Sequence, residues 1–164
     1  MAAVLSSGLA RHHRANPSAS LKTEQLFGLP VLMSGVASLT LLKSEVDALA
    51  QHYKQTLENL LKIHKKTPES FVFFISGSLP FPAILHIRQL GLFGMICRLE
   101  DNILHRLAKY ILTTCSDNIY SWFSQIKMIC TKYRLPHPLT LLESQPSKES
   151  FKKLVKTSGK KNYE

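Results

Sequence analysis

Apolar residues at helical spacing between residues 44 and 64 constrain the fold of this chain more than any other feature. Ser44 and Asp47 resemble a capping box, with Ser44 as the N-cap of a helix. Lys65 to Pro68 interrupt the pattern, so the helix is predicted to run to about His64. The apolar positions between these limits fall on one helical face: Val46, Leu49, Tyr53, Leu57, Leu60 and Leu61.

Pro68 is predicted to begin the next helix, because proline is tolerated in a first helical turn. We expect this helix to turn Phe73 away from the core. A strand is the alternative here, since β-branched and aromatic residues also favour strands. The face expected to be buried consists of Phe71, Val72, Phe74 and Ile75.

Residues 82–96 are apolar almost all round, which is typical of a helix at the centre of a core. Gly91 and Gly94 open one side of this helix for close packing, and His86 and Cys97 are expected to be core residues. Further helical patterns follow, and no pair of strand-like segments is joined by a hairpin turn signal. The sequence therefore predicts an all-α fold, an irregular multi-helix bundle.

Composition divides the chain into three parts. Residues 1–20 are basic and contain no acid, and we expect them to be a flexible segment, although a mitochondrial presequence has a similar composition. Residues 21–143 hold the predicted helical domain. Residues 144–164 form a basic C-terminal helix and tail, in which six lysines stand against two glutamates.

The charge balance indicates the class of partner. Among 164 residues, 21 lysines and arginines stand against 11 acids, which gives a net charge of +10. Such an excess favours nucleic acid or an anionic membrane surface, and a merely basic protein is the alternative. The uncharged stretches are broken by glycine and proline, so we expect them to be protein interior and not membrane spans.

Residues for catalysis, metal binding or cofactor binding are not evident in the sequence. The three aspartates, Asp47, Asp101 and Asp117, lie in separate segments and cannot be paired by spacing to hold Mg²⁺. No zinc spacing and no glycine-rich phosphate loop is present. We therefore expect no enzyme, no cofactor and no metal. A Cys–His pair that uses Cys97, Cys115 or Cys130 remains as an alternative.

Three cysteines without a C-x-x-C pair are not typical of a secreted disulfide scaffold. We therefore expect a location inside the cell, nuclear or cytoplasmic. Trp122 and Tyr133 lie near Lys127 and Lys132, so their rings could stack on nucleic acid bases. The favoured interpretation of Trp122 is a core residue, since it lies in helical register with Ile126.

Several short blocks of sequence occur in the order known from one protein family. The run LHIRQLGLFGMICRL at residues 85–99 resembles a block of non-LTR, LINE-type retrotransposon polyproteins, beyond the reverse transcriptase domain. The run LPVLMSGVASL at 29–39 resembles the segment after the polymerase palm, where members often read PVL-x-[SY]-G. The resemblance covers nearly the whole chain. Further blocks agree at 60–62, 67–68, 76–80, 102–105, 121–123, 135–139 and 146–148.

The resemblance implies a thumb-like, C-terminal part of such a polymerase, without palm and fingers. The family binds its catalytic metals with a paired-Asp motif, and this chain contains no Asp-Asp. The intact region would help to hold the template–primer duplex, so RNA or DNA is the expected partner through phosphate contacts. The candidate contact residues are Lys54, Lys65, Lys66, Arg88, Arg98, Lys127 and Lys132.

A protein-interaction or vestigial helical domain is the second hypothesis. The apolar segments 26–42 and 70–87 would normally pack against the missing palm. If they are exposed, they would drive association with other proteins. Whether the chain is a fragment, a decayed element or a reused remnant stays open.

Overall fold

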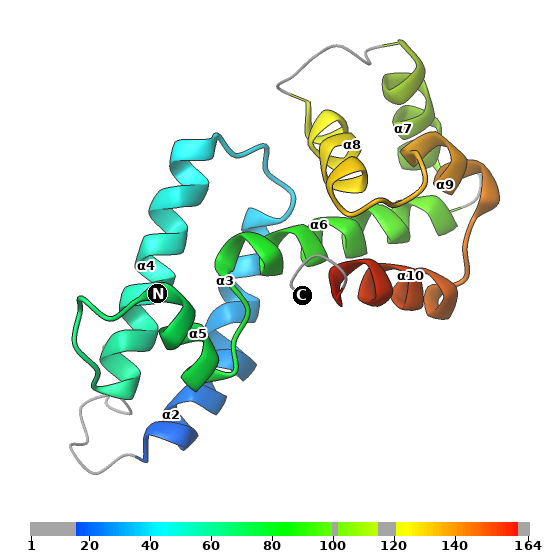
Figure 1. The fold of residues 1–164 in the computed structure, drawn as a ribbon. Coiled ribbons are helices and arrows are strands. Elements are labelled where there is room, and N and C mark those ends of the chain that lie inside the picture. The colour runs from blue at the N-terminus through cyan, green and yellow to red at the C-terminus, as the bar shows by residue number, and fades with distance from the viewer. Residues whose placement is uncertain (1–15, 100–101, 115–120, 161–164) are drawn as a thin grey trace. The chain divides into compact units, whose positions relative to one another are not determined.

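The computed structural model describes residues 16–99, 102–114 and 121–160, and these residues are helical with short connections (Figure 1). The predicted all-α, multi-helix fold is confirmed. In chain order the elements are α2 (Pro17–Thr23), the π-helix η1 (Glu24–Gly28), α3 (Leu29–Val36), α4 (Lys43–Leu61), α5 (Glu69–Ser76), α6 (Phe81–Arg98), α7 (Ile103–Thr114), α8 (Trp122–Lys132), α9 (Pro138–Ser144) and α10 (Lys148–Lys160).

The chain is organised in two compact units. The first unit contains the chain up to Val36 together with Leu41–Leu85, and the second contains Ala37–Thr40 and the chain from His86 onward. Helix α6 begins in the first unit and continues in the second. The division at residues 20 and 143, inferred above from composition, stays a prediction.

Tyr53 of α4 is the centre of the core of the first unit. Its side chain is 1% exposed, and its ring centroid lies 6.2 Å from that of Phe73 in α5 and 6.1 Å from that of Phe81 in α6. Such ring pairs contribute about 1 kcal/mol beyond the burial of apolar area. The other buried apolar residues of this core are Leu21, Met33, Leu57, Val72 and Leu85.

The start of α4 differs from the prediction. Leu42, and not Ser44, is the N-cap, and its backbone N–H donates to the Glu45 carboxylate at 2.8 Å. Glu45 stands at the third helical position, from which a glutamate reaches back to the capping residue. Ser44 therefore lies inside the first turn. The predicted partner Asp47 comes two residues too late for this role.

The end of α4 also comes earlier than predicted, at Leu61 and not at His64. Lys62 takes a left-handed conformation with φ of 56°. The Ile63 N–H then donates to the Glu58 carbonyl at 3.0 Å, and the Lys62 N–H donates to the Asn59 carbonyl at 3.3 Å. These two bonds form a Schellman motif, which satisfies carbonyls at the helix end.

The buried face of α5 is different from the predicted one. Val72 and Phe73 are 0% and 8% exposed, whereas Phe71 is 50% and Phe74 is 83% exposed. Ile75 is also exposed, so the prediction was wrong for three of its four residues. The contact of Phe73 with Tyr53 sets this register. Pro68 is the residue before the helix and not part of its first turn.

The π-helix η1 keeps two distant residues on one face. Leu21 in α2 and Met33 in α3 are both buried in the first core. In an uninterrupted α-helix, residues twelve positions apart would point about 120° apart around the axis. A π-turn accommodates one extra residue, which reduces this angle to about 20°. The turn therefore lets the whole segment from Pro17 to Val36 face a single core.

The core of the second unit forms around the later part of α6. Leu90, Phe93 and Cys97 are at most 1% exposed and pack with residues of α7 to α10. The expected burial of Cys97 is confirmed. Ile87 and Met95 are 45% and 56% exposed, so the helix is buried on one side and not all round as predicted.

Trp122 joins the second core as a packing residue, as the favoured interpretation expected. It packs against the buried cluster, and its indole N–H donates to the Ala37 carbonyl at 3.0 Å. Its ring also meets Phe123 edge-on at 5.2 Å between centroids. Trp122 therefore has a structural role that accounts for its position.

No single described helix has the length and hydropathy needed to cross a bilayer. Helices α5 and α6 pass that test only together, and they are bent by 59° at the break between them.

Replacing Gly94 by alanine is expected to destabilise the second unit, whereas replacing Gly91 is expected to stabilise it. A Cβ at Gly94 would lie 2.7 Å from Phe151 Cε1, but one at Gly91 meets nothing within 4 Å. Alanine is about 1 kcal/mol better than glycine within a helix, whereas overpacking costs about 1–3 kcal/mol. Urea unfolding of the two variants measures this contrast. Equal stabilisation by both would show that Phe151 does not pack closely on Gly94.

Candidate nucleic-acid interface

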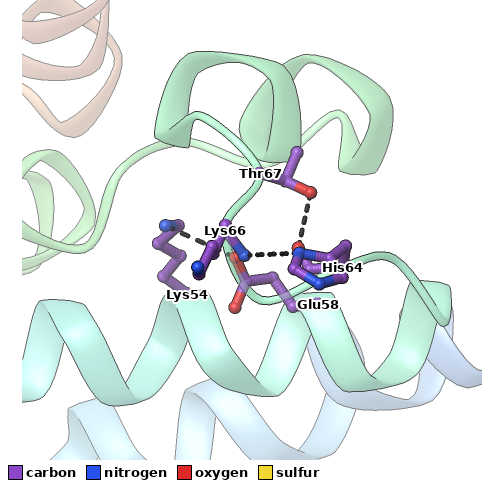
Figure 2. A network of polar contacts seen from close by, with 5 residues as sticks. All are labelled: Lys54, Glu58, His64, Lys66 and Thr67. Carbon is purple, nitrogen blue, oxygen red and sulfur yellow. Dashed lines mark hydrogen bonds and ion pairs between the residues drawn. The ribbon is translucent and has the colours of Figure 1, made fainter.

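The segment from Lys62 to Thr67, called the basic turn below, connects α4 to α5 and contains three lysines. Its backbone is held by His64. The Lys66 N–H donates to His64 Nδ1 at 3.1 Å, and the Thr67 hydroxyl donates to the His64 carbonyl (Figure 2). The Thr67 N–H donates to the same carbonyl at 3.0 Å. The side chains of Lys65 and Lys66 are exposed. The turn therefore presents two ammonium groups from an ordered backbone.

Lys54 is in a different situation from the lysines of the turn. Its Nζ lies 3.4 Å from Glu58 Oε1, and the Glu58 side chain is only 2% exposed (Figure 2). The contact lacks the geometry of a hydrogen bond, so attraction between charges is what joins the two groups. A buried carboxylate needs a counter-charge. Lys54 already provides one, and its phosphate contact stays a prediction.

The other four candidate residues belong to the second unit. Arg88 is exposed on α6, and Lys127 is half-buried on α8. Arg98 and Lys132 stand in the last turns of α6 and α8, where a cation stabilises the negative end of the helix dipole. Lys132 Nζ also lies 5.8 Å from the ring centroid of Tyr133. The seven candidates are therefore divided between the units, three in the first and four in the second.

Most of the candidate cations have no acidic partner among the residues that the structure describes. No carboxylate among the described residues forms an ion pair with Lys65, Lys66, Arg88 or Lys127. An unpaired surface cation keeps its full attraction for an external anion, because no internal contact must first be broken. Lys65 and Lys66 form no ion pair with a described carboxylate, and they also belong to a turn whose backbone is hydrogen-bonded to His64.

His86 is half-buried and not a core residue as expected, and it contributes no positive charge near neutral pH. Its Nδ1 lies 3.0 Å from the Tyr133 hydroxyl, and the two rings meet edge-on. Burial and the nearby charge of Lys132 lower the pKa of His86 to about 4. Tyr133 is itself buried, so the predicted stacking of its ring on a base conflicts with its place in the core.

The described cysteines do not resemble activated nucleophiles. Burial raises the pKa of the Cys97 and Cys130 thiols to about 12, so both are protonated at neutral pH. Cys115 lies outside the described residues. Within the described ranges, no three His, Cys, Asp or Glu side chains gather closely enough to hold a metal ion.

A second polar cluster in the first unit was not predicted. The Glu24 carboxyl is 6% exposed and lies where a Cβ of residue 28 would be, which the glycine there allows. Burial raises the pKa of Glu24, and its Oε1 has no hydrogen-bond partner among the described residues. Gln25 Nε2 donates to Ser78 Oγ at 3.1 Å. Nothing local in the sequence marks a π-turn, so this cluster had no recognisable pattern.

The exposed aromatic residues beside the basic turn were also missed. Phe71 and Phe74 follow it on the outer face of α5. One indication was available in the sequence, because the run FVFF at residues 71–74 cannot be buried by a single helical face. At least one of its rings had to be exposed.

Comparisons of this chain with protein families, with curated proteins and with solved structures find no match. The functional argument therefore depends on the geometry and charge described above. The resemblance of the sequence to LINE-type polyproteins serves only to interpret that geometry.

Acid is expected to destabilise the second unit through His86. The folded pKa of about 4 lies below the ordinary value of 6.5, so the folded chain binds the proton less well. The stability contributed by neutral His86 is complete above pH 6.5 and is lost as the pH falls toward 4. Urea unfolding from pH 7 to pH 4 should show a smaller loss for His86→Gln. An identical loss in both proteins would contradict this role.

Removing the charge of Lys54 is expected to destabilise the first unit. Lys54→Met leaves the Glu58 carboxylate buried without its cation, at a cost of about 2 kcal/mol or more. Glu58→Met added to Lys54→Met should recover much of this loss, because no unpaired charge remains. A double-mutant cycle by urea unfolding measures the coupling. A coupling of zero would mean that the pair contributes nothing.

Proposed function

We propose that this chain is a non-catalytic fragment or remnant of the thumb-like, C-terminal region of a LINE-type reverse transcriptase, and that it binds the phosphate backbone of nucleic acid. The observation that carries the binding proposal is the hydrogen-bonded basic turn, whose Lys65 and Lys66 form no ion pair with any described carboxylate. The all-α fold and the blocks at 29–39 and 85–99 agree with the proposed origin.

The proposed binding is electrostatic and tolerant of sequence. Lysines that contact phosphates release counterions, and this release drives non-specific binding with dissociation constants of about 10⁻⁴–10⁻⁶ M at physiological salt. The net charge of +10 favours attraction of a polyanion to the chain. Such a role requires no reaction centre.

Reversing the charges of the basic turn is expected to weaken binding and its dependence on salt. In Lys65→Glu/Lys66→Glu, the slope of log affinity against log salt should fall by about 0.9 per lost contact on a duplex and about 0.7 on a single strand. Fluorescence anisotropy with a labelled RNA–DNA hybrid, at several salt concentrations, measures both quantities.

The matched control is Lys22→Glu/Lys43→Glu. It changes the net charge equally, at two exposed lysines of the same unit. Equal weakening by both double variants would show that only the total charge matters. An affinity of the unaltered chain that does not vary with salt would overturn the proposal of phosphate contacts.

A protein-interaction or vestigial domain is the second candidate, because both apolar segments keep large exposed side chains. Their exposed fractions range from 44% to 83%. Exposed apolar side chains promote association where they form a contiguous surface. Self-association without nucleic-acid binding at low salt would favour this candidate. The residues concerned are Leu26, Phe27, Val31, Leu39, Leu42, Phe71, Phe74, Ile75, Leu79 and Ile87.

A further inference from the structure

Two aromatic rings stand exposed on the helix that follows the basic turn. Phe71 is 50% and Phe74 is 83% exposed. They are three residues apart, so they lie on one face of α5 and about 4.5 Å apart along its axis. The Phe71 and Val72 N–H groups both donate to the Pro68 carbonyl, which starts α5 directly after Thr67. Lysines and rings therefore belong to one continuous, hydrogen-bonded segment.

This exposure is imposed by the opposite face of α5. Val72 is fully buried, and Phe73 stacks on Tyr53 with an interplanar angle of 22°. At the end of the helix, the Ser78 N–H donates to the Phe73 carbonyl at 3.2 Å. Turning α5 to bury Phe74 would bring Phe73 into water. The two outer rings therefore stay accessible while the core is intact.

Unpaired cations beside accessible rings fit a ligand that carries both negative charge and flat apolar faces. Single-stranded nucleic acid has both features, since its phosphates attract lysines and its unpaired bases stack on aromatic side chains. In a duplex the faces of the bases are already covered by their neighbours. A duplex can therefore use Lys65 and Lys66 but gains nothing from Phe71 and Phe74.

We propose that the basic turn and the outer face of α5 form a site for single-stranded nucleic acid, in which phosphates contact Lys65 and Lys66 and bases stack on Phe71 and Phe74. This inference rests on the proposed function and narrows its ligand to single strands at this site. An anionic membrane is the less suitable partner, because α5 has only eight residues and is short for a helix that lies on a membrane surface.

The test separates stacking from charge by changing only the rings. In Phe71→Leu/Phe74→Leu the side chains stay apolar and no charge is altered. We expect the affinity for a labelled twelve-nucleotide oligo(dT) or oligo(U) to fall about tenfold, because base stacking is lost. The affinity for the RNA–DNA hybrid and the salt slope on both ligands should be unchanged, because the phosphate contacts remain.

The control is Tyr110→Leu, which removes an aromatic ring 62% exposed in the second unit. It should leave both affinities unchanged. Circular dichroism and urea unfolding confirm that each variant is folded. Unchanged single-strand binding in the Phe71→Leu/Phe74→Leu variant, or an equal loss on the hybrid, would overturn the inference.

Three further results have distinct meanings. Absence of binding to both ligands at low salt would overturn the proposed function itself, and the inference with it. Binding to phosphatidylserine-containing vesicles that is lost in Phe71→Leu/Phe74→Leu, with oligonucleotide binding unchanged, would overturn the inference in favour of a membrane surface. Salt-dependent binding to both ligands with no effect of the rings would leave the proposed function standing and remove only the stacking site.

Discussion

The packing of Tyr53 against Phe73 and Phe81 is the interaction on which the first unit depends. One nearly inaccessible ring from α4 contacts aromatic residues of α5 and of the start of α6. Because Phe73 occupies this inner position, Phe71 and Phe74 must point outward. The same contact that stabilises the core therefore creates the aromatic surface next to the basic turn. The register of α5 therefore determines both the packing of the core and the exposure of the rings in the proposed binding site.

Two acids of the first unit, Glu24 and Glu58, lie in its interior. Glu58 is buried, and Lys54 is occupied in balancing it. Glu24 is also buried, and its raised pKa disfavours its charged form. Glu58 and Lys54 are both included in the net charge of the sequence, and together they add nothing to it. Lys65 and Lys66 have no such internal partner among the described carboxylates. An approaching polyanion therefore encounters fewer negative groups than a count of residues implies.

Sequence patterns predicted the elements of this fold better than their registers. The helical spacing of the apolar residues was sufficient to predict α4, because these residues lie on one face only. The ends of α4 were predicted less well, because they depend on Glu45 and on the left-handed conformation of Lys62. In α5 the run FVFF offers several equivalent faces, and only the distant Tyr53 selects between them. The exposure of Lys65 and Lys66 agrees with the sequence. That Phe71 and Phe74 are exposed close to these lysines in the chain could be learned only from the structure, because it depends on which of the aromatic rings are buried in the core.

The π-turn at Glu24–Gly28 makes the packing of α2 depend on the number of residues in this segment. Removing one residue from it would convert the turn to ordinary α-helix, and the backbone hydrogen bonds would be kept. The preceding helix α2 would, however, rotate by about 100° about its axis. Leu21 would then leave the face that it shares with Met33. A single-residue deletion here would therefore disturb the core as a substitution of Leu21 does, although no core residue would have been changed.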